Sequence, residues 1–164
     1  MRYGLIGCGG IGALRAEALA KMDGHDLVVA CDSDMDRARS LTEKYGGTAV
    51  DSWADMVKRD DIDAVIVSTP PGLHMEMSVA ALNAGKHVLC EKPLARNPEE
   101  CQSMIDAAHR SDRILATGFN YRFYPSILKA RELFDSGIIG ELDHVRSYTG
   151  YSATAHDHEW LHEF

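Results

Sequence analysis

Short apolar runs alternate with longer amphipathic stretches along the first 117 residues of the chain. The apolar runs predict strands, because almost wholly apolar strands are typical of a parallel sheet that helices cover on both faces. The amphipathic stretches predict those helices. The expected strands are residues 3–6, 27–31, 48–50, 64–68, 87–90 and 114–117. The expected helices are 11–22, 35–45, 52–59, 73–83 and 98–110, the last with Asn97 as its N-cap. This alternation predicts an α/β fold with a doubly wound parallel sheet.

The first expected strand runs directly into the pattern G-x-G-x-x-G. Its glycines are Gly7, Gly9 and Gly12, and Asp32 closes the next apolar run 20 residues after Gly12. In such a turn the first glycine allows a tight bend, the second admits a pyrophosphate close to the backbone, and the third lets helix and strand pack closely. We therefore expect a Rossmann domain that binds a dinucleotide; the alternative is a strand–helix turn that binds nothing. The expected contacts are Gly7, Gly9, Gly10, Ile11, Gly12 and Asp32.

The acidic residue also indicates which dinucleotide is bound. A carboxylate at Asp32 would accept hydrogen bonds from the adenosine ribose hydroxyls and repel a 2′-phosphate. We therefore expect NAD(H) in preference to NADP(H). Ser33 and Arg37 follow closely in the sequence and would soften that preference.

The pattern changes after Gly118. Residues 125–136 predict one further helix, and residues 142–151 alternate in the manner of an antiparallel strand. We expect residues 1–119 to form the dinucleotide-binding domain and residues 120–164 to begin a second α+β domain. An open strand edge is a pairing site, so self-association into a homo-oligomer through residues 142–151 is one expectation.

Composition argues against several classes of protein. The formal net charge of −8 is unlike the basic surface that binds nucleic acid. The chain has no apolar run of about 18 residues, the length that a transmembrane helix needs. The first core strand begins at Tyr3, which leaves no room for a signal peptide, so we expect a cytoplasmic protein. The four cysteines form no C-x-x-C pair and are expected to be reduced residues of the core.

Two further segments follow strands at the edge where open α/β sheets bind ligands. Residues 68–74, Ser-Thr-Pro-Pro-Gly-Leu-His, contain two prolines that stiffen the loop before a helix N-terminus. The alternative for this segment is a rigid connector. Residues 91–94, Glu-Lys-Pro-Leu, place Lys92 where it could donate to a ribose or substrate hydroxyl and move a proton. A cis bond before Pro93 would aim Lys92 into the cleft; the alternative is a solvated surface turn.

A third segment lies at the expected domain junction. Asn120, Tyr121 and Arg122 are polar groups suited to a hydroxylated substrate, although a packing and capping role is equally compatible with the sequence.

Taken together, these segments resemble the Gfo/Idh/MocA oxidoreductases, the family of glucose–fructose oxidoreductase and inositol dehydrogenase. The resemblance runs from residue 1 to roughly 150, and its specific signature is Glu91-Lys92-Pro93 after the fifth strand. It implies hydride transfer between NAD(P) and a hydroxyl-bearing carbon of a sugar or polyol. It also implies that Lys92 assists catalysis and contacts the nicotinamide ribose. The implied cofactor contacts beyond the glycine turn and Asp32 are Ser68, Thr69, Pro70, His74, Glu91 and Lys92, and the implied substrate contacts are Asn120, Tyr121 and Arg122.

The sequence departs from the family in its second half. Family members carry a longer second domain with a D-x-x-x-H pattern, whose histidine is the usual acid/base, and this pattern is absent here. Two interpretations stay open: a shortened form of a longer dehydrogenase, or a cofactor-binding module without turnover.

One motif points to different chemistry. His158, Glu159 and His162 fit H-E-x-x-H, a zinc-binding pattern when it lies on a helix. The pattern ends two residues before the last residue and has no following segment to supply a third ligand. We expect a mobile tail with at most adventitious metal binding, and no metal site.

Overall fold

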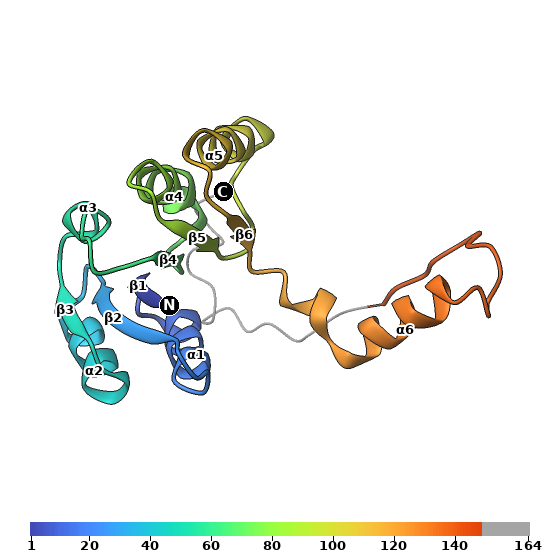
Figure 1. The fold of residues 1–164 in the computed structure, drawn as a ribbon, viewed down its shortest axis with the longest axis horizontal. Coiled ribbons are helices and arrows are strands. Elements are labelled where there is room, and N and C mark those ends of the chain that lie inside the picture. Colours follow the sequence, from blue (N-terminus) through green and yellow to red (C-terminus); the bar gives the residue numbers. More distant parts are fainter. Residues whose placement is uncertain (149–164) are drawn as a thin grey trace. The chain divides into compact units, whose positions relative to one another are not determined.

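The computed structural model describes residues 1–148, which divide into a compact unit over residues 1–118 and a second that begins at Phe119. In the first unit, six parallel strands form one sheet in the order β3-β2-β1-β4-β5-β6 (Figure 1). This strand order is typical of dinucleotide-binding sheets. From β1, the chain first adds strands on one side (β2, β3) and then, from β4, on the other side. The strands are β1 (Arg2–Ile6), β2 (Asp26–Cys31), β3 (Thr48–Val50), β4 (Ala64–Val67), β5 (His87–Cys90) and β6 (Leu115–Thr117).

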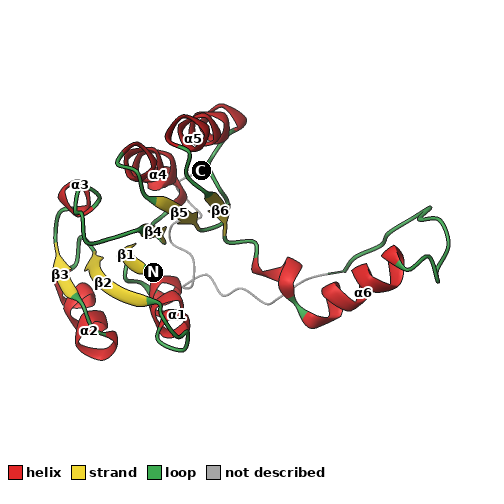
Figure 2. Ribbon diagram, viewed as in Figure 1, coloured by secondary structure: helices red, strands yellow, loops and turns green. Residues whose placement is uncertain are grey.

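Helices cover both faces of this sheet, as Figure 2 shows. The helices of the first unit are α1 (Gly10–Leu19), α2 (Met35–Tyr45), α3 (Trp53–Met56), α4 (His74–Asn83) and α5 (Pro98–Ser111), with a short 3-10 turn η1 (Pro71–Leu73) before α4. Alternate residues of a strand point to opposite faces. Leu5 therefore packs with Ala16 of α1, whereas the next residue, Ile6, packs with the cluster that contains Met77 of α4 and Met104 of α5. The doubly wound fold predicted from the hydrophobic pattern is confirmed.

Local signals explain most helix ends. Asn97 caps α5 by accepting a hydrogen bond from the Glu100 amide at 2.8 Å, and Gly46, with a φ of 90°, ends α2. The third helix is shorter than the expected 52–59. Beyond Met56 the backbone bonds change to the tighter i→i−3 pattern, with the Lys58 amide on the Asp55 carbonyl, so the α-helix stops.

The second unit, taken by itself, contains a 3-10 turn η2 (Asn120–Phe123) and one helix α6 (Pro125–Asp135). The strand expected over residues 142–151 is wrong for residues 142–148, which form no regular element; the remainder lies outside the described residues. A strand needs a neighbour to satisfy its backbone donors and acceptors. Within the described part of this unit no second strand is present, and Leu142 and Val145 stay exposed.

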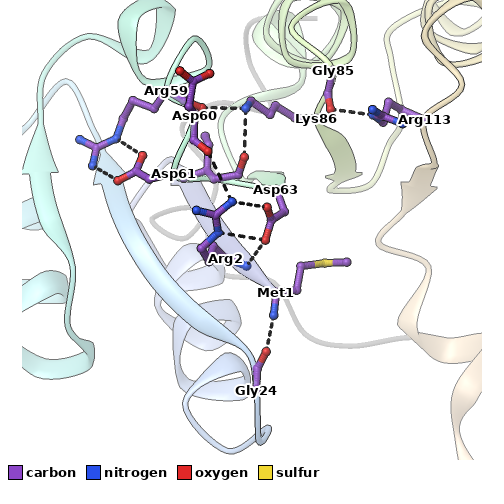
Figure 3. A network of polar contacts seen from close by, with 11 residues as sticks. Met1, Arg2, Gly24, Arg59, Asp60, Asp61, Asp63, Gly85, Lys86 and Arg113 are labelled. Atoms are coloured by element: carbon purple, nitrogen blue, oxygen red, sulfur yellow. Dashed lines mark hydrogen bonds and ion pairs between the residues drawn. The ribbon is translucent and has the colours of Figure 1, made fainter.

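Charged side chains link neighbouring segments at the amino-terminal edge of the sheet (Figure 3). Arg2 at the start of β1 meets Asp63, which precedes β4. The Arg2 Nη2 and Nε atoms lie 2.6 and 3.2 Å from its two carboxylate oxygens, and the Arg2 amide adds a bond of 2.8 Å. Lys86, before β5, is 8% exposed and donates to the carbonyls of Arg59 and Ile62 at 2.7 and 3.0 Å. The loops that enter three strands are thereby joined.

The Asp63 pair predicts a pH dependence. The hydrogen bonds from Arg2 lower the pKa of Asp63 from 3.8 to about 2. A carboxylate with a lowered pKa stabilises the fold above its unfolded value and loses this contribution as the pH falls through its folded value. We expect Asp63→Asn to lower the free energy of unfolding most above pH 3.8, with the difference shrinking toward pH 2, as measured by urea titration. Asp36→Asn, at an exposed pair on α2, is the control and should show little difference at any pH.

Candidate functional site

Backbone hydrogen bonds continue the sheet one residue beyond four of its strands. The first residue after each of β1, β4, β5 and β6 donates its amide to the last residue of a neighbouring strand, at 2.8 to 2.9 Å. These donors are Gly7, Ser68, Glu91 and Gly118. This row of four hydrogen bonds fixes where three loops begin along one edge of the sheet: the glycine turn after β1, the Ser68 loop after β4 and the Glu91 loop after β5. The predicted cofactor segments are therefore brought together.

The glycines of the first loop differ in how much space a side chain would have. Gly7 has a φ of 90°, and a Cβ there would lie 2.6 Å from the Ser68 carbonyl oxygen. A Cβ on Gly12 would collide with the Gly7 carbonyl oxygen. At Gly9 and Gly10, by contrast, a Cβ would meet nothing within 4 Å. The outer two glycines are required by the fold itself, and the inner two leave open space beside the backbone.

That open space adjoins a helix N-terminus. Helix α1 begins at Gly10, and its N-cap Gly9 makes no side-chain cap. The amides of a first helical turn have no partner within the helix, and they carry its positive end. Gly10, Ile11 and Gly12 therefore lie where backbone amides can bind an anion such as a pyrophosphate.

Asp32 joins this loop to the next strand. Its Oδ2 accepts a hydrogen bond from the Cys8 amide at 2.6 Å, and its Oδ1 accepts one from the Asp34 amide at 2.9 Å. The carboxylate thus holds the glycine loop against the end of β2. The sequence analysis missed this second role of Asp32. The bond to the residue two positions on is the Asx-turn that aspartate commonly makes, so part of it was accessible to sequence reasoning.

The thiols around the loop belong to the core. Cys8, Cys31 and Cys90 are buried, as expected for residues of the core, whereas Cys101 is partly exposed. Burial raises the pKa of Cys8 to about 12, of Cys31 to about 11 and of Cys90 to about 12. Because the thiolate is the nucleophile, these three groups are unsuited to catalysis near neutral pH.

The loop after β4 is held by its own histidine. His74, at the start of α4, is fully buried. Its Nε2 lies 2.8 Å from the Thr69 carbonyl oxygen and its Nδ1 lies 2.8 Å from the Pro93 carbonyl oxygen. Pro70 precedes η1, and the Leu73 amide donates to its carbonyl at 3.0 Å. His74 thus connects the Ser68 loop to the turn that carries Lys92.

That turn contains a cis peptide bond between Lys92 and Pro93, and Lys92 itself is exposed. Its neighbour Glu91 is 7% exposed. Glu91 forms an ion pair with Arg15 of α1, whose Nε donates to the carboxylate at 2.5 Å. A Cβ on Gly118 would lie 2.7 Å from the same carboxylate. Sequence reasoning missed Arg15, whose only signal is its position one helical turn after Gly12.

Two of the expected cofactor contacts, His74 and Glu91, have partners within the protein. The His74 ring has no exposed surface, and both of its nitrogens face backbone carbonyls. The Glu91 carboxylate accepts a hydrogen bond from Arg15. Their contacts with a cofactor stay a prediction.

The expected substrate residues lie in the second unit. Asn120, Tyr121 and Arg122 belong to η2, and the Tyr121 ring lies 5.0 Å from that of Tyr124. All three side chains are exposed. The first unit brings together the cofactor segments, and these three residues form a group of their own.

Within residues 1–148, no helix is long and apolar enough to cross a membrane. No group of three or more His, Cys, Asp or Glu side chains in that range could hold a metal ion. The H-E-x-x-H segment at residues 158–162 lies outside the described residues.

Residues 1–119 match the family model of the Gfo/Idh/MocA proteins, described as an oxidoreductase family with an NAD-binding Rossmann fold. The chain belongs to this family. The resemblance inferred from the glycine turn and the Glu-Lys-Pro signature is thus confirmed.

Known Gfo/Idh/MocA proteins extend the similarity past residue 119. Myo-inositol 2-dehydrogenase of Thermotoga maritima is 38% identical over 142 residues, which are 86% of this chain and 42% of that protein. A solved scyllo-inositol dehydrogenase from Lactobacillus casei, with bound NAD(H) and scyllo-inositol, has a TM-score of 0.80 and 30% identity, covering 86% of this chain and 42% of that one. A solved 3-ketoreductase from Actinomadura kijaniata, in complex with NADP, has a TM-score of 0.79 and 34% identity, covering 86% and 45%. The chain spans 38 to 46% of the length of its curated relatives.

An added methyl group should change the free energy of unfolding at Gly12 but not at Gly9. Gly12→Ala forces a Cβ onto the Gly7 carbonyl, so we expect a loss of roughly 1–3 kcal/mol in the free energy of unfolding, the range for overpacking. Gly9→Ala is the matched control, because its Cβ enters open space, and its midpoint should stay close to that of the unmodified chain. Denaturant titration measures both, and equal stabilities for the two variants would contradict the assignment.

Proposed function

We propose that this chain binds NAD(H) along the carboxyl edge of β1, β2, β4 and β5. We also propose that the whole protein transfers a hydride between nicotinamide and the hydroxyl-bearing carbon of a sugar or polyol. The observation that carries the proposal is the row of hydrogen bonds that sets the anion-binding glycine loop beside the loop of Lys92. The similarity to dehydrogenases of inositols and to a 3-ketoreductase supports this substrate class.

The residues present fit the cofactor. The space beside Gly9 and Gly10, which a Cβ would enter without contact, admits a pyrophosphate close to the backbone. The amides at the start of α1 would bind that pyrophosphate, and Asp32 would accept hydrogen bonds from the adenosine ribose. A bound nicotinamide supplies the hydride acceptor or donor. Lys92 would donate to the nicotinamide ribose or the substrate hydroxyl and assist movement of the proton at that oxygen.

We propose a supporting role for the second unit. Residues 120–164 would begin the substrate domain, with Asn120, Tyr121 and Arg122 as polar groups for a hydroxylated ligand. Phe123, Ile127 and other apolar side chains of this unit are exposed, as expected for a surface that further chain or a second copy covers. A homo-oligomer is compatible with that surface. The buried free thiols support a reducing, cytoplasmic location.

The first test concerns cofactor choice. Asp32→Asn keeps an oxygen that can accept from the Cys8 amide but removes the negative charge. Because hydrogen bonds to charged groups contribute about 1.5–3 kcal/mol, we expect NADH affinity to fall roughly 10- to 100-fold. NADPH affinity should fall much less, because the repulsion of its 2′-phosphate is relieved at the same time. Calorimetric titration with both cofactors measures the gap, and tighter binding of NADPH by the unmodified chain would refute the NAD(H) preference.

The second test concerns Lys92. In a dehydrogenase assay of the whole protein over a panel of sugars and inositols, we expect Lys92→Ala to lower kcat by roughly 10²-fold, the size typical of a lost acid–base group. Lys58→Ala removes an exposed lysine from another turn and serves as the control. If kcat and NADH affinity were unchanged in Lys92→Ala, Lys92 would be a solvated residue of a surface turn.

A further inference from the structure

The turn after β5 has an unusual distribution of exposure. Lys92 is exposed, while the residues on either side of it contact the partly buried Arg15 and the buried His74. On one side, the Glu91 side chain is 9% exposed and pairs with Arg15, whose own side chain is 25% exposed. On the other side, the Pro93 carbonyl faces His74, which has no exposed surface. The backbone of Lys92 is therefore fixed from two directions, by α1 and by α4.

The Arg15 contact also determines which cation Glu91 can bind. Removing one member of a buried ion pair leaves an uncompensated charge, which is stabilised by any other cation within reach. Without Arg15, the nearest cation to Glu91 in the sequence would be Lys92, whose ammonium group could then pair with the Glu91 carboxylate. In the structure as described over residues 1–148, Lys92 takes part in no ion pair. Arg15 thus leaves the Lys92 ammonium available for a ligand.

The His74 contact acts on the backbone. Both of its partners, the carbonyls of Thr69 and Pro93, can only accept hydrogen bonds. The ring therefore lies between the loop after β4 and the loop after β5 and contacts both of them at the sheet edge.

We infer that Arg15 and His74 are positioning residues that hold Lys92 toward the nicotinamide half of the cofactor. Arg15 acts by occupying Glu91, and His74 acts by holding the Pro93 carbonyl. Neither side chain is required to touch the cofactor. The inference rests on the proposed function, because it assumes that NADH binds at this edge and that Lys92 faces its nicotinamide ribose.

The test compares the affinities of NADH and ADP, which share the adenosine diphosphate half of the cofactor. NADH carries the nicotinamide ribose, whereas ADP carries only the adenosine and diphosphate. We expect Arg15→Met to weaken NADH roughly tenfold, the effect of a displaced charged hydrogen bond, and to leave ADP affinity within about twofold. Arg39→Met, which breaks an exposed pair on α2, should change neither affinity. Calorimetry gives both affinities, and thermal unfolding checks that each variant is folded.

Two double variants separate positioning from structural damage. In a Lys92→Ala background, Arg15→Met should have no further effect on the ratio of NADH to ADP affinity, because the residue it positions is gone. Adding Glu91→Gln to Arg15→Met should restore much of the NADH affinity, because no carboxylate is left to bind Lys92. His74→Leu should lower the same ratio, and His74→Gln, whose side-chain amide can still donate a hydrogen bond, should lower it less.

The outcomes are distinguishable. A parallel loss of NADH and ADP affinity in Arg15→Met, or a full Arg15 effect without Lys92, would overturn the inference while leaving the proposed function intact. If the unmodified chain bound neither ligand, the proposed function itself would be wrong and the inference would be refuted with it.

Discussion

The site depends on a row of four backbone hydrogen bonds at the carboxyl edge of the sheet. Parallel strands carry their amides and carbonyls at even spacing, so a ladder that is in register at the last strand residue stays in register one residue further. The bonds donated by Gly7, Ser68, Glu91 and Gly118 use this property. The loops therefore start from fixed points, and the positions of the residues just beyond those points are set by the hydrogen bonds of the sheet.

This constraint accounts for the two kinds of glycine in the first loop. Gly7 takes part in the row and turns sharply beneath the Ser68 carbonyl, and Gly12 returns the chain against Gly7. A side chain at Gly7 would collide with the Ser68 backbone, and one at Gly12 would collide with the Gly7 carbonyl. Gly9 lies between them with open space around it, and this space is where the proposed pyrophosphate would lie. One motif thus combines a packing requirement with a binding requirement, which explains why its spacing is so restricted.

Periodicity predicted every strand and helix of the first unit, although α3 ends at Met56, earlier than the predicted residue 59. The strand expected at residues 142–151 failed at residues 142–148, because alternation indicates a strand only where a partner strand exists. The contacts of Glu91 and His74 were also beyond sequence reasoning. Arg15 lies 76 residues from Glu91 along the chain, and the His74 ring reaches a carbonyl 19 residues away. Such partners are set by the order of strands, which local spacing does not encode.

The strand order also explains why a buried acid can stand next to an exposed base. An adjacent glutamate and lysine in a flexible turn would satisfy each other, and neither would be available for a ligand. Here α1, which follows the central strand β1, delivers Arg15 to Glu91. Glu91 is paired within the fold, while Lys92 next to it is exposed. The helix whose N-terminus adjoins the glycine loop therefore also supplies the partner of Glu91, so one element contacts both the first loop and the turn of Lys92.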